Sequence, residues 1–226
     1  ITVDGVDTDH SPFDTGSYAS STTYVTGAAV VKACTQLNEQ IAAEGARRLN
    51  IHPERAEFDG DNVYDRTNPE HCITLDQLAQ SLVVGEGTQW LTATASHCSP
   101  TSPPPFMAGF AQVEVDLETG EAKVVDYVGV VDCGTVVNKN LARVQAEGGI
   151  AQGIGMALLE DIKYDPKGQM VNSTFMTYKI PCRTDLPEIR VDFEESYEPN
   201  GPFGAKSIGE VVINTPSPAI AHAIYN

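Results

Sequence analysis

The spacing of apolar residues predicts a long helix in the first half of the chain, from Tyr24 to Leu49. Apolar side chains recur there mostly at helical spacing, at Val25, Ala29, Val30, Ala33, Leu37, Ile41 and Leu49. Pro53 follows shortly afterwards, where such a helix would stop. A shorter helix is expected after Thr74, which with Gln77 nearly forms a capping box before the stripe Leu75, Leu78 and Leu82.

Strand patterns flank these two helices. Residues 56–64 are expected to form a hairpin that turns at residues 59–62. The β-like runs at residues 2–6 and 89–96 are expected to be strands, and the polar residues 7–17 between them are expected to be a loop.

A proline-rich stretch, residues 99–105, interrupts the chain. Because consecutive prolines fit neither a helix nor a central strand, it marks a subdomain boundary or a long crossing loop. After it, alternation over residues 110–116, a turn at 117–120 and a return over 123–131 predict a β-hairpin. Residues 138–159 then predict a long helix.

The last part of the chain predicts a hairpin, a strand and a helix. Residues 162–164 and 169–171 flank an Asp-Pro-Lys-Gly turn, residues 187–195 resemble a strand, and a final helix begins at Pro218. Strands and helices alternate, but hairpins are frequent, so the order favours an α+β fold over a doubly wound sheet.

Charge narrows the class of protein. The 226 residues include 14 basic and 31 acidic side chains, for a net charge of −17. This charge argues against nucleic acid or an anionic membrane as partner, because both need a basic surface. No run of about 18 apolar residues exists to span a membrane. The start of the chain resembles no signal peptide and lacks an initiator Met, so we expect a fragment, a processed product or part of a longer protein.

The cysteines form no metal-binding pattern. They are widely spaced and include no Cys-x-x-Cys pair, so neither a zinc site nor an iron–sulfur cluster is expected on this chain. Free thiols in a reducing cytoplasm are expected instead. The five histidines show no ligand spacing, and nucleophile-elbow, phosphate-loop and His-Glu-x-x-His motifs are absent from the sequence.

Residues 201–210, GPFGAKSIGE, are the most informative stretch. Three glycines surround one lysine, and the stretch ends on Glu210 just before an apolar segment. A carboxylate on a glycine-rich turn can lie close to a ligand and be tuned by burial, as a general base requires. A solvated glutamate on a surface loop is the alternative, and it is the commoner case for such a stretch alone.

Two other segments could approach a ligand. Residues 148–155 contain four glycines in the expected helix, each costing about 1 kcal/mol relative to Ala. Close packing against another backbone is the favoured reason, and a nearby ligand is the alternative. Gln145 and Gln152 share one face of this helix, from which buried amides could bond a heterocycle or only backbone. The Ser- and Thr-rich residues 16–23 could bind an anion, although simple N-capping is commoner.

In order along nearly the whole chain, these segments resemble the molybdenum hydroxylases, the xanthine dehydrogenase and aldehyde oxidase family. The similar part is the C-terminal half of the molybdopterin-binding subunit. The segments are GSYASSTTYVTGAAVVKAC, FMAGFAQVEVDLETGEAKVVDYVGVVDCGTVVN, VQAEGGIAQGIGMALLE, YKIPCRTDLPEI and GPFGAKSIGE. The resemblance implies an α+β fold of mixed and antiparallel sheets with packed helices. It implies two lobes, residues 1–100 and residues 101–226, the second carrying the glutamate segment.

The resemblance also implies roles for single residues. Glu210 matches the catalytic glutamate, a general base that takes a proton from a hydroxide on molybdenum while hydride passes to a sulfido ligand. The cofactor-binding positions carried over are Tyr18, Ala19, Ser20, Gln145 and Gly209, with Gln152 and Gly153 as weaker matches. Ser21 stands where many relatives have Arg, and Lys139 stands where Pro often occurs.

Cofactors and partner chains follow from the same resemblance. We expect molybdopterin, in its cytosine dinucleotide form, with molybdenum, and FAD and a 2Fe–2S cluster on partner chains. The expected partners are the N-terminal half of the molybdopterin subunit, an iron–sulfur subunit and an FAD subunit, without which the chain would be inactive. The expected reaction uses water to hydroxylate an electron-poor carbon of an N-heterocycle such as a purine or nicotinate, with aldehydes as second choice.

Two alternatives stay open. A non-catalytic scaffold subunit would keep the fold without a working site, although Glu210 and Gln145 would then serve no purpose. A generic acidic binding module would place Tyr18, Gln145 and Glu210 far apart, with the glycine-rich segments facing solvent.

Overall fold

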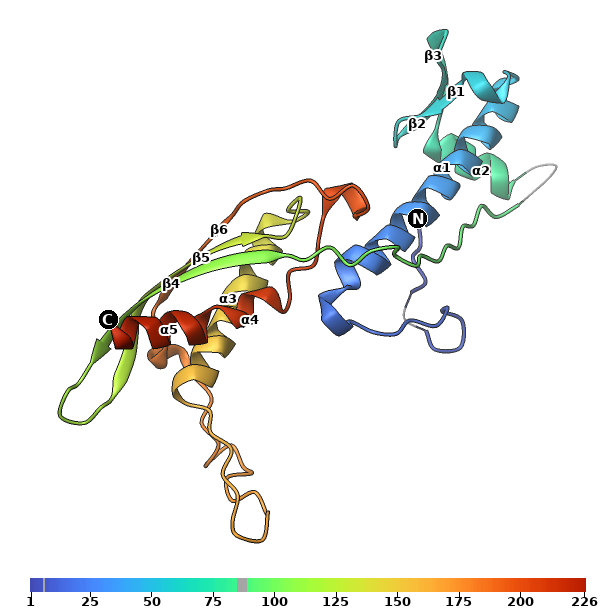
Figure 1. The fold of residues 1–226 in the computed structure, drawn as a ribbon. Helices are drawn as coiled ribbons and strands as arrows, with labels where there is room; N and C mark the ends of the chain where they lie inside the picture. Colours follow the sequence, from blue (N-terminus) through green and yellow to red (C-terminus); the bar gives the residue numbers. More distant parts are fainter. Residues whose placement is uncertain (6, 85–88) are drawn as a thin grey trace. The chain divides into compact units, whose positions relative to one another are not determined.

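The computed structural model describes residues 1–5, 7–84 and 89–226 (Figure 1). The chain forms two compact units, one of residues 26–98 and the other of residues 1–25 together with 99–226. The proline-rich stretch begins at Ser99, where the chain leaves the unit of residues 26–98 and returns to the other unit. The units differ from the expected lobes of residues 1–100 and 101–226 in the placement of residues 1–25, and the lobe division stays a prediction.

The unit of residues 26–98 packs two helices with a three-stranded antiparallel sheet. The helices are α1 (Gly27–Leu49), which follows a π-helical turn at Thr22–Thr26, and α2 (Leu75–Val83). The strands β1 (Ala56–Phe58), β2 (Asn62–Asp65) and β3 (Asn68–Thr74) pair in sequence order. The long helix, the first hairpin and the capped helix are thus confirmed, and the Thr74–Gln77 capping box is complete.

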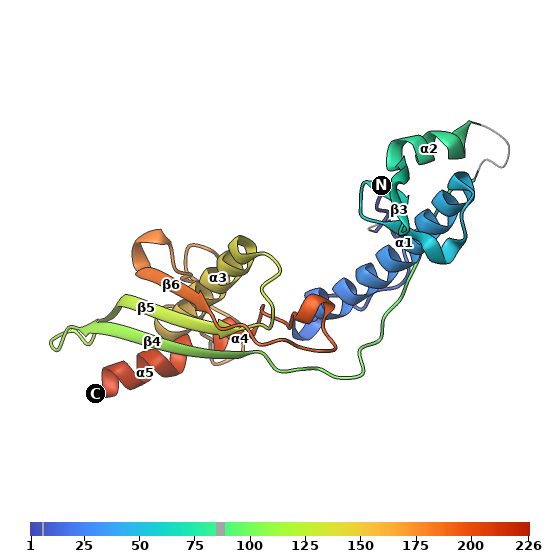
Figure 2. The ribbon, with the colours of Figure 1, turned by 90° about the horizontal axis from the view of Figure 1, so that it is seen from above.

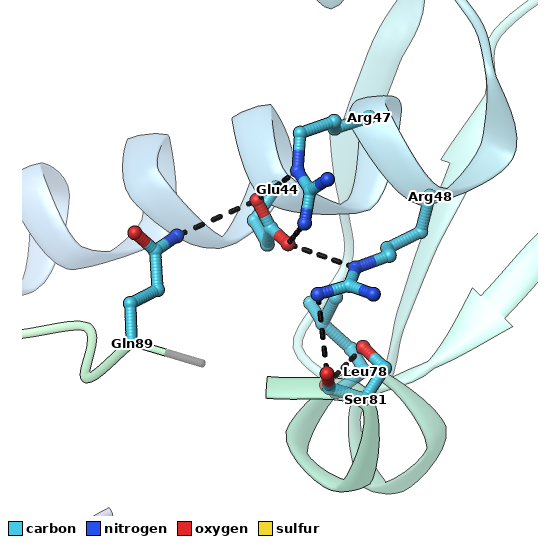
Figure 3. A network of polar contacts seen from close by, with 6 residues as sticks. All are labelled: Glu44, Arg47, Arg48, Leu78, Ser81 and Gln89. Carbon is cyan, nitrogen blue, oxygen red and sulfur yellow. Dashed lines mark hydrogen bonds and ion pairs between the residues drawn. The ribbon is translucent and has the colours of Figure 1, made fainter. Parts of the chain in front are cut away.

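A buried carboxylate joins the end of α1 to α2. Glu44 is only 5% exposed. It accepts hydrogen bonds from Arg47 at 2.6 and 2.8 Å and from Arg48 Nε at 2.9 Å (Figure 3). Arg48 also donates to the carbonyl of Ser81 in α2 at 3.1 Å, and Gln89 donates to Glu44 at 3.5 Å. The two helices are therefore held by one polar network beside the apolar core.

The other unit contains a mixed sheet whose one face is covered by helices (Figures 1 and 2). Strands β4 (Phe106–Val115) and β5 (Ala122–Asp132) form the expected antiparallel hairpin, and β6 (Glu188–Phe193) pairs with β5 in parallel. The helices are α3 (Lys139–Leu158), α4 (Val211–Asn214) and α5 (Pro216–Tyr225). Together with the antiparallel sheet of the first unit, this mixed sheet confirms the expected α+β fold.

The covered face of this sheet holds the core of the unit. Tyr127 of β5, Ile150 and Ile154 of α3 and Ile220 of α5 are buried in one cluster. Short 3₁₀ turns complete the chain at Tyr18–Ser20, Pro53–Arg55, Arg183–Asp185 and Pro202–Gly204.

The glycines of α3 allow close packing, as favoured from the sequence. A Cβ on Gly149 would lie 2.3 Å from Val212, one on Gly153 would lie 2.6 Å from Pro216, and one on Gly155 would lie 2.6 Å from Pro181. At Gly148 nothing lies within 4 Å. Three of the four glycines are therefore required by neighbouring segments rather than by a ligand.

Four strand expectations need correction. Residues 2–5 and 89–96 form no strand, because neither run has a ladder partner, and Val6 lies outside the described residues. Residues 162–164 and 169–171 make only one bridge, between Tyr164 and Met170, across the expected turn. The sequence analysis also missed β3, an exposed edge strand with a proline and little apolar alternation.

Candidate functional site

The glycine-rich residues 201–210 lie against the C-terminal end of β5. Lys206 N donates to the carbonyl of Cys133 at 2.7 Å, and Thr135 N donates to the carbonyl of Gly204 at 2.8 Å. Gly134 and Ala205 form an antiparallel bridge between these bonds. Gly204 has a φ of +87°, which favours glycine. The backbone before Glu210 is thus paired like a short strand.

An ion pair between Lys206 and Asp132 lies next to this backbone pairing. Lys206, 9% exposed, donates from Nζ to Asp132 Oδ2 at 2.9 Å. Ser196 Oγ donates to the same carboxylate at 2.8 and 2.9 Å, and the Gly134 amide donates to it at 2.9 Å. Burial would raise the pKa of Asp132, but these donors and the Lys206 charge hold it below its usual value. Asp132 is therefore a carboxylate held in its ionised form.

Glu210 lies at the start of α4, beside the turn that contains Ser20. Ser20 Oγ donates to Glu210 Oε2 at 3.1 Å. A Cβ on Gly209 would lie 2.7 Å from Ser20 Oγ and 3.8 Å from Gln145 Nε2. Glycine at this position therefore lets three segments that are distant in sequence approach one another.

The backbone of the Ser20 turn is unusual. Ala19 and Ser20 have φ values of 50° and 56°, a left-handed conformation that is uncommon for residues other than glycine. Such conformations cost of order 1–3 kcal/mol each and persist where the surrounding structure imposes them, often at ligand sites. The backbone conformation of this turn is therefore of the kind found at ligand sites.

An open pocket of about 630 Å³ lies between these segments, within the unit of residues 1–25 and 99–226. Its volume falls in the range of about 300–1,000 Å³ that is typical of small-molecule and cofactor sites. Its polar lining includes Ser17, Ser20, Thr22, Thr23, Thr135, Asn138, Gln145, Lys206 and Glu210. Val136, Val137, Leu141 and Ile208 supply apolar surface.

The pocket brings together four of the residues expected at the site, which are Ser20, Gln145, Gly209 and Glu210. Tyr18 is 68% exposed and does not line the pocket, and neither does Ala19. The weaker matches are also outside it, since Gly153 packs on Pro216 and Gln152 is exposed.

Burial at the site differs from the expectation. Glu210 and Gln145 both line the pocket, and both are exposed. Gln145 and Gln152 are both exposed, so the possibility of buried amides on this face of α3 is not realised in this chain. Thr22 and Thr23 of the Ser- and Thr-rich stretch line the pocket, together with Ser17 and Ser20.

Sequence reasoning missed the lysine–aspartate pair and part of the lining. Asp132 and Lys206 are 74 residues apart, so no local pattern connects them. Asn138, the N-cap of α3, and Leu141 in its first turn also line the pocket. The position of Asn138 before an apolar helix was the available signal for a residue at a helix end.

The donor set suits an organic group better than a bare ion. Among residues 1–5, 7–84 and 89–226, no group of three or more His, Cys, Asp or Glu side chains could hold a metal. Hydroxyls, an amide and a carboxylate instead offer donors and acceptors to a heterocycle with polar edges, and the apolar side chains offer a surface for its rings. The residues present therefore fit a pterin-type cofactor.

In the described part of the chain, no helix has the length and hydropathy needed to cross a bilayer.

Comparison with known proteins identifies the family. Residues 1–187 match the model of the molybdopterin cofactor-binding domain. The chain therefore belongs to this family, and its expected place among the xanthine dehydrogenase and aldehyde oxidase proteins is confirmed. The matched residues include Gln145 but end before Glu210.

Relatives extend the likeness over almost the whole chain. The probable hypoxanthine oxidase XdhD of Escherichia coli K12 is 35% identical over 97% of this chain. The matched region is 23% of the length of XdhD. The solved CO dehydrogenase of Oligotropha carboxidovorans (27% identity, TM-score 0.85) and quinoline 2-oxidoreductase of Pseudomonas putida 86 (28% identity, TM-score 0.84) each align with 96% of this chain. This chain spans 28% of each solved chain. It thus corresponds to about a quarter of these proteins.

Proposed function

We propose that this chain supplies the general base, Glu210, of a molybdopterin-dependent hydroxylase that uses water to hydroxylate an electron-poor carbon of an N-heterocycle. The observation that carries the proposal is the meeting of Ser20, Gln145, Gly209 and Glu210 in one pocket of a chain whose family binds molybdopterin. A carboxylate with one oxygen held by a neighbour and with access to the pocket is a suitable proton acceptor.

The residues of the pocket divide the work between binding and proton transfer. The Gln145 amide and the hydroxyls of Ser17, Thr22 and Thr23 are suited to hold the polar edge of the cofactor. Ser20 orients Glu210 through its hydrogen bond, and Glu210 accepts the proton. When bound, the cofactor supplies the redox-active metal. We propose the cytosine dinucleotide form, with FAD and a 2Fe–2S cluster on partner chains receiving the electrons.

The substrate class rests on the names of relatives. Hypoxanthine and quinoline, which occur in the names of two of them, are both N-heterocycles. We propose a purine or a nicotinate-like ring for this chain.

Because the chain spans about a quarter of its relatives, we also propose that the N-terminal half of the subunit and the iron–sulfur and FAD subunits are needed for turnover. The cysteines are free, which agrees with our proposal of a cytoplasmic location.

Glu210→Gln in the assembled enzyme tests the base assignment. The amide keeps the size of the side chain but cannot accept the proton, so we expect kcat to fall by about 100-fold or more, within the range for a general base. The measurement is steady-state turnover per bound molybdenum. Near-normal kcat with full molybdenum loading would show that Glu210 is not the base.

Glu118→Gln provides the matched control, because Glu118 is an exposed glutamate in the β4–β5 turn. We expect this variant to keep normal turnover.

Metal analysis of the wild-type assembly distinguishes an enzyme subunit from a scaffold subunit. Absence of both molybdenum and pterin under all growth conditions would favour the scaffold.

A further inference from the structure

We propose that Lys206 is a positioning residue whose ion pair with Asp132 fixes the segment that carries Glu210. The proposal rests on the proposed role of Glu210 as base. It concerns a side chain that the hydroxylase proposal itself does not use. Lys206 is buried beside Asp132, only three residues separate it from Glu210, and Glu210 itself is weakly held.

The pair is more elaborate than a surface ion pair. Lys206 is 9% exposed, and its Nζ lies 2.9 Å from Asp132 Oδ2 and 5.5 Å from the centre of the Phe106 ring. Ser196 and the Gly134 amide occupy the remaining acceptor positions of Asp132. Asp132 is partly buried, with its side chain 19% exposed. Removing charges from water is costly, so such a pair is weak evidence for stability alone, and replacement by apolar groups is often neutral. Its orienting effect on the backbone is the better explanation.

The pair acts at a point close to Glu210. The backbone of Lys206 is bonded to Cys133, the residue next to Asp132, so side chain and main chain are anchored at the same place. Only Ser207, Ile208 and Gly209 separate Lys206 from Glu210. On the other side of Glu210, Val212 is fully buried against α3. The backbone of Glu210 therefore lies between two fixed positions, Lys206 and Val212. A displacement of the backbone at Lys206 would be expected to displace Glu210.

Glu210 has little fixation of its own. Its side chain is exposed, and its hydrogen bond to Ser20 is 3.1 Å long. The position of the carboxylate therefore depends mainly on the backbone that bears it. Since misplacement by about 1 Å can cost about 100-fold in rate, loss of one anchor should affect catalysis more than binding.

The test is kinetic and uses the assembled, molybdenum-loaded enzyme. Lys206→Met keeps the length and apolar stem of the side chain but removes the charge. We expect kcat per molybdenum to fall by about 10- to 100-fold with KM within about threefold, since the lost effect is on geometry. Hydrogen exchange of residues 204–210 should become faster. Lys206→Arg, which keeps a charged donor, should recover part of the rate.

A double-mutant cycle isolates the pair. Asp132→Asn should lower kcat in the same way, and the double variant with Lys206→Met should be no slower than the worse single variant, because both remove one interaction. Ser196→Ala keeps the charges and should have a smaller effect of the same kind, so it serves if the other variants fail to assemble. Lys163→Met is the matched control, since Lys163 pairs with Asp161 at 3.4 Å and both are largely exposed.

Different results overturn different claims. A normal kcat per molybdenum in Lys206→Met, with Glu210→Gln inactive, overturns the positioning role and leaves the base in place. A raised KM with unchanged kcat also overturns it, because Lys206 would then contact the ligand directly at the pocket wall. Near-normal kcat in Glu210→Gln overturns the base, and with it the positioning of a base.

Discussion

At the scale of single residues, three carboxylates differ in how firmly their surroundings hold them. Glu44 is buried and held by Arg47 and Arg48, and Asp132 is held by Lys206 and Ser196. Both have donors for their oxygens in the native structure, and both have a lowered pKa. Glu210 is exposed at a pocket with one donor, Ser20. A carboxylate left partly free at a pocket is the one available to take up a proton.

The native environment of Glu44 predicts loss of stability in acid. Hydrogen bonds from Arg47, opposed by burial, lower the pKa of Glu44 from its usual 4.5. The unfolded chain therefore takes up this proton first as the pH falls. The stabilisation is complete well above pH 4.5 and is lost as the pH falls through the lower native pKa.

Urea unfolding of wild type and Glu44→Gln at several pH values measures this effect. We expect the variant to be less stable at neutral pH by about 1.5–3 kcal/mol, the value of hydrogen bonds to charged groups. We also expect a shallower loss in acid. Glu39→Gln, an exposed position on the same helix, is the control and should match wild type. Equal acid profiles for wild type and Glu44→Gln would show that Glu44 is not the sensitive group.

At the scale of elements, α3 links the core to the site. Its glycine face packs on α4 and on Pro216, while its first two turns contribute Leu141 and Gln145 to the pocket. Any change in the distance between α3 and α4 would move Val212, two residues after Glu210. The glycines are therefore needed to set the geometry of the site as well as to fill the core.

Two neighbouring glycines of α3 give opposite predictions. Gly149→Ala would place a Cβ 2.3 Å from Val212, and overpacking of about 1–3 kcal/mol should exceed the gain in helix propensity. Gly148→Ala meets nothing within 4 Å and should stabilise the helix by up to about 1 kcal/mol. Thermal unfolding of the two variants checks this. A higher Tm for Gly149→Ala would contradict the packing role.

At the scale of the whole molecule, much apolar surface is exposed. Phe106 and Phe110 of β4 are 61% and 66% exposed, and Leu141, Val144 and Met156 of α3 are each more than half exposed. Large exposed apolar areas usually mark interaction surfaces. Because the chain spans about a quarter of its relatives, we propose that other parts of a longer protein cover them.

The isolated chain should therefore associate with itself. We expect it to bind a hydrophobic dye and to show light scattering that rises with concentration, because its apolar surface lacks partners. The same chain co-expressed with the rest of its parent protein should show neither. An isolated chain that stays monomeric and binds no dye would contradict the proposal that these surfaces are covered in an assembly.

The sequence by itself determined the elements whose signals are local. The apolar period of α1, the alternation of β4 and β5 and the capping box of α2 each lie within one segment, so neighbouring residues suffice to specify them. The family resemblance likewise depended on contiguous motifs, and it brought Ser20, Gln145, Gly209 and Glu210 forward as a set.

Only the tertiary structure decided which segments meet. The parallel pairing of β6 with β5, the Lys206–Asp132 pair and the contact between Ser20 and Glu210, which are 190 residues apart, join positions with no common local pattern. The edge strand β3 forms because β2 offers a ladder, whereas residues 89–96 alternate better but have no strand to pair with. Long-range pairing and burial depend on where the chain returns in space, and a local period carries no information about that.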